Sequence, residues 1–159
     1  MHGTALSLND CALAQRCQEC CILLDPINLA TNPKAIPGSV AEYTLVVTNQ
    51  GLGAVDGDTM VISDVIAADA SLYVSTASGD PLQFTDGPVA SELNFTYGAD
   101  VTYSNQRGGG APFTYIPIPD VDGLDPAVTG IRMNPIGGMN AAFGASTLSF
   151  TLQYQIRVE

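Results

Sequence analysis

Apolar and polar residues alternate with a period of two along much of this chain, which is the spacing of an extended strand. In residues 40–48 the apolar side chains stand at every second position, and turn-forming residues flank the run on both sides. The longest alternation covers residues 146–158, with apolar side chains at Leu148, Phe150, Leu152, Tyr154, Ile156 and Val158. Both runs therefore predict strands that bury one face.

Shorter apolar runs between these two, separated by Gly, Pro and Asp, predict further strands. The expected ranges are 58–65, 71–75, 82–85, 92–97, 100–104, 112–118 and 128–133. No strong helical period is present after residue 32. Many short strands separated by turns are typical of an antiparallel sandwich. Residues 32–159 are therefore predicted to form one all-β domain, an antiparallel β-sandwich.

Residues 1–31 differ from the rest and are predicted to form an N-terminal arm. This arm holds all four cysteines and the single histidine, His2. Ser7 or Asn9 is a suitable cap for a short helix, so a helix or an irregular segment is expected up to about residue 19. An apolar strand over residues 20–25 follows, and it ends where a proline comes next.

Two segments carry a family resemblance. The first, Asn32–Val65, consists of a Pro-Gly turn, a Tyr-Thr-aliphatic strand and a Thr-Asn-x-Gly turn followed by a second strand. The second, Phe113–Arg132, resembles the longer, secreted form of the family named next. The chain resembles, over roughly Asp25 to Glu159, the immunoglobulin-like repeat domain of unknown function found in bacterial and archaeal surface and secreted proteins. It departs from that pattern at Ile66-Ala67-Ala68, where the family has a proline. The resemblance implies an immunoglobulin-like fold and an extracellular or cell-surface location, and it implies no reaction.

Charge and composition argue against several classes of function. The formal net charge is −11 with five basic residues, so no basic patch is available to neutralise phosphates and no nucleic-acid partner is expected. No stretch approaches the roughly 18 consecutive apolar residues of a transmembrane helix. Because His2 is the only histidine, a Ser-His-Asp or Cys-His arrangement would need a terminal base. The sequence therefore predicts no enzyme activity, no catalytic residue and no cofactor, with calcium as a possible ion.

Three groups of residues are candidates for covalent or ionic chemistry. Disulfides within the arm or between subunits are the first expectation for the cysteines, with buried or free thiols and a metal site as alternatives, at Cys11, Cys17, Cys20 and Cys21. Calcium prefers several hard oxygens around a glycine bend, which makes a candidate of the turn with Asp120, Asp122 and Asp125, whose alternative is a solvated acidic turn. Asn94-Phe95-Thr96 is an N-glycosylation acceptor sequence.

The favoured hypothesis is a non-catalytic structural protein that binds copies of itself in an extracellular or surface assembly, plausibly a filament. An open sandwich exposes unpaired backbone groups at its edges, and the arm supplies an extended apolar segment that would pair there in a neighbouring copy. The donated residues would be Cys20, Cys21, Ile22, Leu23, Leu24, Ile27 and Leu29. The long strand 146–158 is the expected receiving edge. The alternative is a monomeric adhesin-like module that recognises a glycan or surface ligand through loops at 79–88 and 107–111.

Overall fold

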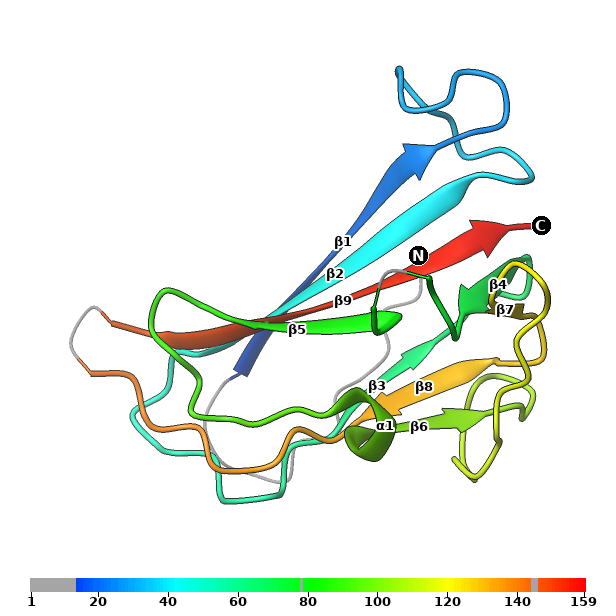
Figure 1. The fold of residues 1–159 in the computed structure, drawn as a ribbon. Coiled ribbons are helices and arrows are strands. Elements are labelled where there is room, and N and C mark those ends of the chain that lie inside the picture. Colours follow the sequence, from blue (N-terminus) through cyan, green and yellow to red (C-terminus); the bar gives the residue numbers. More distant parts are fainter. Residues whose placement is uncertain (1–13, 78, 144–145) are drawn as a thin grey trace.

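Two antiparallel sheets make up the structure, a computed structural model that describes residues 14–77, 79–143 and 146–159 (Figure 1). The larger sheet has the strand order β1-β2-β9-β4-β7, with β5 pairing along β9 as well, and the smaller has the order β3-β8-β6. The elements are β1 (Ala14–Leu24), β2 (Val40–Asn49), β3 (Ile62–Val65), β4 (Ala70–Tyr73), β5 (Leu82–Asp86), α1 (Tyr97–Asp100), β6 (Val101–Ser104), β7 (Leu124–Asp125), β8 (Gly130–Met133) and β9 (Leu148–Val158). The predicted all-β, antiparallel class is confirmed.

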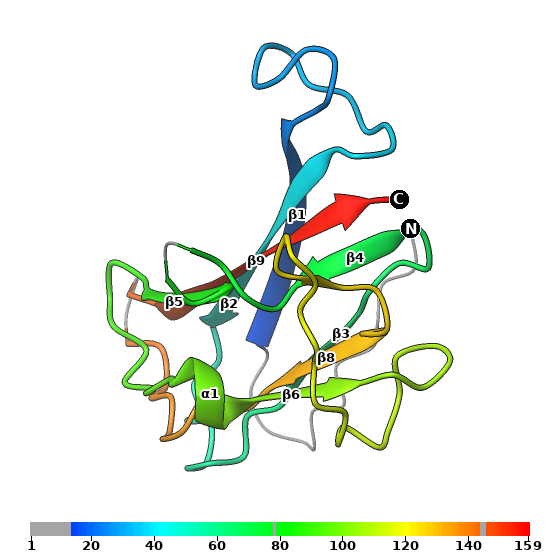
Figure 2. The ribbon, with the colours of Figure 1, turned by 45° about the vertical axis from the view of Figure 1, so that its right-hand side comes forward.

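The core lies between the two sheets, which form separate layers in Figure 2. Strand β9 supplies Phe150 and Leu152 from the larger sheet, and β8 supplies Ile131 and Met133 from the smaller; all four are almost completely buried. Each such side chain contributes about 1.5–3 kcal/mol by leaving water. The Phe84 ring extends the core by stacking on the Phe150 ring, with centroids 5.1 Å apart. The alternation seen in the sequence thus produces a two-layer sandwich.

Strand β9 is the centre of the larger sheet. It pairs on one edge with β2, from Val40 opposite Arg157 to Asn49 opposite Leu148. On its other edge it pairs first with β5 and then with β4. The prediction that this strand is the open receiving edge is therefore wrong, because both of its edges are already occupied within the chain.

The N-terminal arm is more extended than the sequence indicated. The helix or irregular segment expected up to residue 19 is wrong for residues 14–19, because β1 begins at Ala14 and pairs with β2 from there. The open edge of β2 offers these polar residues a complete set of backbone partners, which outweighs a local helical preference. The capping residues proposed for that helix lie outside the described residues.

Two expected strands do not form. In the range 92–97, only Asn94 makes an isolated bridge, and Glu92 has a φ of 67°, which an extended strand does not use. In the range 112–118 only Tyr115 makes a bridge. Prolines at 112, 117 and 119 lack the N–H that a ladder requires. Conversely, β7 has two residues and no sequence signal of its own.

Candidate assembly edge and surface depression

Strand β1 forms the outer edge of the larger sheet. Within the described residues it pairs with β2 alone, in a register that places Gln18 opposite Leu45, Cys20 opposite Tyr43 and Ile22 opposite Ala41. Its other edge therefore presents backbone N–H and C=O groups without a strand partner in the described structure. Such an edge is a template for pairing with another chain.

From residue 18 to residue 24 of β1, few side chains are buried. Cys20 and Cys21 are exposed, and Leu23 is half-buried. Among residues 18–24, Ile22 packs partly against the core, and Leu24 is exposed at the end of the strand. By contrast, every second residue of β9 from Leu148 to Ile156 is buried. Backbone pairing with β2 is therefore the main attachment of β1 in this part of the chain.

A polar contact from Gln18 ties β1 to the smaller sheet. The Gln18 Nε2 donates to Asp64 Oδ2 on β3 at 3.0 Å, and the Tyr154 hydroxyl donates to the same oxygen at 2.8 Å. Asp64 is almost completely buried, so these donors offset the cost of removing its carboxylate from water. The Tyr154 ring stacks on Tyr43 with centroids 5.3 Å apart. Burial, with a smaller effect from Cys20, raises the pKa of Tyr43 to about 12.

A compact loop, the Asp25 loop (residues 25–39), connects β1 to β2. The Asp25 Oδ1 accepts the backbone N–H groups of Ile27 at 2.7 Å and Asn28 at 2.5 Å. Its Oδ2 accepts the Asn28 side-chain amide at 3.0 Å and the Lys34 N–H at 2.6 Å. These donors, the Asn28 N–H above all, lower the pKa of Asp25 to about 2. The Asp25 loop is therefore ordered around one buried side chain.

Two of the residues predicted to be donated lie in the Asp25 loop and not in an extended strand. Ile27 is 77% exposed and Leu29 is 66% exposed, and both lie in the loop rather than in an extended strand. Leu29 has a φ of 54° and exchanges backbone hydrogen bonds with Asp25, so the chain turns there. The extended segment available for donation therefore ends at Leu24.

The predicted disulfides have a partial outcome. Cys20 and Cys21 are free thiols, and as neighbours in β1 they stand beside different partners, Tyr43 and Glu42. Cys17 lies in β1, opposite Val46, and Cys11 lies outside the described residues. An intermolecular disulfide stays a prediction.

The carboxylates of the proposed calcium turn are held by contacts within the protein. Asp120 Oδ1 accepts the N–H groups of Asp122 and Leu124, both at 2.9 Å, and the Leu124 N–H above all lowers the pKa of Asp120. Asp122 forms an ion pair with Arg157 at 3.1 Å. Asp125 is buried and accepts the Tyr115 hydroxyl at 2.9 Å. The described ranges hold no group of three or more His, Cys, Asp or Glu side chains that could bind a metal; calcium binding stays a prediction.

Asn94 lies on the surface of the sandwich. The residue is exposed, and its backbone N–H and C=O both pair with Ile136 at 2.8 Å. The acceptor sequence is therefore located in a surface segment that bridges to another loop, and glycosylation of Asn94 stays a prediction.

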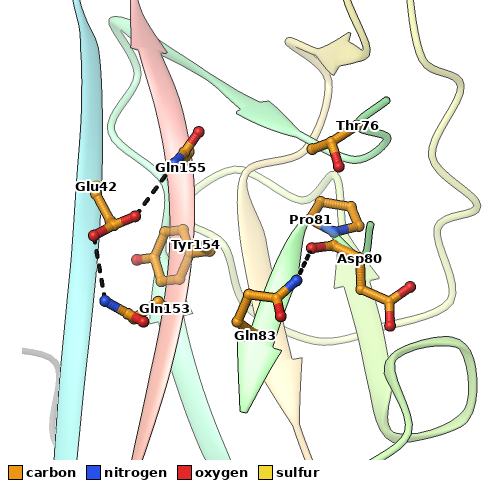
Figure 3. Close-up of a pocket in the computed structure, with 8 residues that line it drawn as sticks. All are labelled: Glu42, Thr76, Asp80, Pro81, Gln83, Gln153, Tyr154 and Gln155. Atoms are coloured by element: carbon orange, nitrogen blue, oxygen red, sulfur yellow. Dashed lines mark hydrogen bonds between the residues drawn. The ribbon is translucent and has the colours of Figure 1, made fainter. Parts of the chain in front are cut away.

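A polar depression of about 300 Å³ lies where the edge of β9 passes from β4 to β5 (Figure 3). Two acidic and three amide side chains surround it, at Glu42, Asp80, Gln83, Gln153 and Gln155. The amides of Gln153 and Gln155 each donate to the Glu42 carboxylate at 3.2 Å. Sequence reasoning named the loop at 79–88 but not these strand residues, since outward-facing polar positions in a strand carry no distinguishing signal.

Comparison of the chain with family models, curated proteins and solved structures finds no match. The class of protein is therefore assigned from the structure alone. It is an antiparallel β-sandwich with a long edge strand, β1. The described ranges contain no helix with the length and apolarity that crossing a bilayer requires.

Proposed function

We propose that this protein is a non-catalytic structural module of an extracellular or surface assembly, and that copies join by exchanging β1. The observation that carries the proposal is the position of β1, an edge strand of 11 residues that pairs with β2 along its length and has exposed side chains at residues 18–21. Donated to a neighbouring copy, the strand would make the same ladder with β2 that it makes within its own chain. The immunoglobulin-like topology and the surface location belong to the same proposal and rest on the resemblance.

The edge strand β6 of the smaller sheet differs from β1, and the difference supports β1 as the exchanged strand. Beside β6 lies a proline-rich segment, which makes a backbone bridge from Tyr115 to Tyr103. The buried Asp125 carboxylate fastens that segment by accepting the Tyr115 hydroxyl at 2.9 Å and the Ile118 N–H at 2.7 Å. Prolines beside an edge prevent further pairing. The chain thus covers the β6 edge, whereas β1 contains no proline.

The energetics of exchange are close to balanced. Each backbone hydrogen bond contributes a net of about 0.5–1.5 kcal/mol, and the bonds broken within the chain are the bonds remade between chains. The cost is the opening of the Asp25 loop, with the loss of its four hydrogen bonds to Asp25. A strand tethered by a short linker has an effective concentration of order mM. Exchange between chains is therefore favoured at high protein concentration or where a further contact joins the copies.

A cross-strand disulfide tests the proposal. In a background with Cys11, Cys17 and Cys20 changed to Ser, Glu42→Cys places a thiol directly opposite Cys21. Oxidised glutathione, as electron acceptor, should then link the two strands. Strand exchange predicts a ladder of covalent multimers on a non-reducing gel, growing with protein concentration. Pairing only within the chain predicts cross-linked monomers at every concentration, and that result would overturn the proposal.

The matched control is Thr44→Cys in the same background. Thr44 occupies the next position on the same face of β2, but its partner is Glu19 rather than Cys21. It should cross-link much more slowly than Glu42→Cys. Equal rates would show that the thiols meet by random collision, so that the ladder reports no strand pairing.

A monomeric binding module is the second candidate, and the polar depression of Figure 3 favours it. Its carboxylates and amides suit a ligand with many hydroxyl groups, such as a glycan. The depression carries no aromatic ring for stacking on a sugar except Tyr154, whose hydroxyl is turned toward Asp64. Titration with an oligosaccharide panel, followed by NMR shifts of the Gln83, Gln153 and Gln155 side-chain amides, tests it. Absence of saturable shifts would eliminate this candidate.

A further inference from the structure

The outer edge of β1 is the longest strand edge without a strand partner in the described part of the chain. Figure 1 shows β1 as the outermost strand of the larger sheet. It has 11 residues, whereas β5, β3, β6 and β7, which also stand at sheet edges, have five or fewer. Short edge strands resist further pairing, and long ones invite it. A further strand is therefore added most readily at β1.

The residues of β1 do little to protect this edge. Proline and lysine, which often protect edge strands, do not occur in β1. A β-bulge also protects an edge, but the register shift between β1 and β2 lies near the C-terminal end of β1, between Ile22 and Leu24. Residues 14–22 pair regularly with β2, and the side chains at residues 18–21 are exposed. This stretch is therefore a regular template for a second strand.

The strand β1 of a second copy fits this template. When two identical strands pair antiparallel about a two-fold axis, residues equally far from the axis stand opposite each other. With the axis at Cys20, Glu19 stands opposite Cys21 of the partner copy, and Gln18 stands opposite its Ile22. With the axis one residue earlier, two Glu19 carboxylates would face each other, which destabilises a strand pair. The axis at Cys20 avoids that repulsion and brings two exposed free thiols together.

We infer that two copies of this protein pair through the outer edges of β1, antiparallel and about a two-fold axis at Cys20, so that their larger sheets become one continuous sheet. This contact goes beyond strand exchange, because β1 keeps its place on β2 and uses its opposite edge. A two-fold contact closes on itself and yields a dimer. Opposite Cα atoms of an antiparallel pair are about 4.5–5.5 Å apart, which lies within the range of roughly 4.4–6.8 Å that a disulfide spans. Oxidised glutathione can therefore join the two Cys20 thiols, and it leaves as two molecules of glutathione.

The alternation of side chains makes the thiols a test of this pairing. Neighbouring residues of a strand point to opposite faces, so in a continuous sheet Cys20 can bond to Cys20 of the partner copy but not to its Cys21. Two full-length proteins carry Cys11→Ser and Cys17→Ser, and each keeps only Cys20 or only Cys21. With oxidised glutathione, the protein that keeps Cys20 should dimerise at least about tenfold faster than the other, because pairing holds its thiols together. In a mixture with one protein isotope-labelled, intact mass should show dimers of the Cys20 protein and almost no mixed dimers.

A second test measures the contact without a disulfide between copies and without strand exchange. The Glu42→Cys protein described above, oxidised at low concentration and purified as the cross-linked monomer, has β1 locked to its own β2. Analytical ultracentrifugation of this locked protein should show a monomer–dimer equilibrium with nothing larger. Cys20→Lys, in place of Cys20→Ser, puts two like charges at the axis and should weaken the dimer by about tenfold or more. Thr85→Lys makes the same change of charge at an exposed position of β5 and should not weaken the dimer.

Three results would each refute the inference: a locked protein that stays monomeric at every concentration, equal weakening by Cys20→Lys and Thr85→Lys, or mixed thiol dimers that form as fast as Cys20 dimers. Mixed dimers at that rate would mean that the thiols meet by random collision. The gel ladder of the unlocked Glu42→Cys protein separately decides strand exchange. A ladder without locked dimers would leave strand exchange standing, and locked dimers without a ladder would leave only the edge contact.

Discussion

At the scale of single residues, buried polar side chains fix the loops and join the layers. Asp25 and Asn49 each stand at the end of a strand and satisfy several backbone groups of the adjoining loop. Asp64 joins the two sheets through Gln18 and Tyr154. The sequence marked Asn49 as a turn residue and Asp25 only as a strand end. The donors to Asp25 are close to it in sequence. They reach its carboxylate only because the loop turns back on itself, and the hydrophobic pattern of the sequence does not predict that turn.

The depressed pKa of Asp25 predicts a pH dependence. Its folded pKa of about 2 lies below the ordinary 3.8, so folding favours the ionised form. The stability that this carboxylate contributes is fully present above about pH 4 and is lost as the pH falls toward 2. Urea unfolding of the wild type and of Asp25→Asn, measured from pH 6 to pH 2, should show a difference in unfolding free energy that shrinks across this window. A difference that stays constant with pH would contradict the assignment.

The buried hydroxyl of Tyr154 gives a second prediction. Tyr154→Phe keeps the ring stacked on Tyr43 and removes one donor to Asp64. We expect the unfolding free energy to decrease by about 1–3 kcal/mol, because the buried carboxylate loses a partner. Tyr73→Phe, in β4, is the control, since no hydrogen bond of its hydroxyl is found within the described residues, and it should change stability by less. Chemical denaturation of both variants at neutral pH measures the difference, and equal effects would contradict this role of the hydroxyl.

At the scale of the elements, alternation located the long strands and failed for short or polar ones. Strands β2 and β9 were predicted almost to the residue because one face of each meets the core. The start of β1 was missed because residues 15–19 are mostly polar and are extended only through pairing with β2. The proline-rich segment at 112–118 was predicted as a strand from its apolar content, yet it lies beside β6 with only one bridge. The polar depression depends on three strands meeting, which the sequence does not reveal.

The position of β1 at the edge of the sheet, with exposed side chains at residues 18–21, predicts uneven hydrogen exchange. Amides that bond β1 to β2 should exchange faster than those that bond β2 to β9, because opening β1 exposes little of the core. Mass spectrometry of deuterated peptides at neutral pH measures both sets in one experiment. Peptides from β5, which pairs with β9 through five residues, serve as the internal reference for a short strand. Equal protection of β1 and β9 would mean that the sandwich opens only as a whole.

At the scale of the whole molecule, the excess of negative charge opposes the proposed association. The formal net charge of −11 makes copies repel at long range, whereas the exposed apolar side chains act only at contact. The proposed assembly would therefore depend on conditions that reduce the repulsion. The composition revealed the net charge, but the identity of the exposed apolar side chains required the structure.

Ionic strength should therefore control self-association. The Debye length decreases from about 30 Å at 0.01 M salt to about 10 Å at 0.1 M, which screens repulsion between whole molecules before it affects apolar contacts. We expect light scattering from concentrated protein to increase over this range. Glu19→Gln with Asp122→Gln, which removes two exposed carboxylates, should shift the rise to lower salt. Scattering that decreases with added salt would show that attraction between charges dominates.

The central place of β9 has a consequence during synthesis on the ribosome. Every strand that pairs with β9 precedes it in the sequence, and its partner β2 lies about a hundred positions earlier. Until β9 has emerged, β2, β4 and β5 each lack their shared neighbour, and the inner face of the larger sheet cannot close over the core. A nascent chain therefore stays open until residues 148–158 have been made, and it depends on this late, long-range pairing to become a domain.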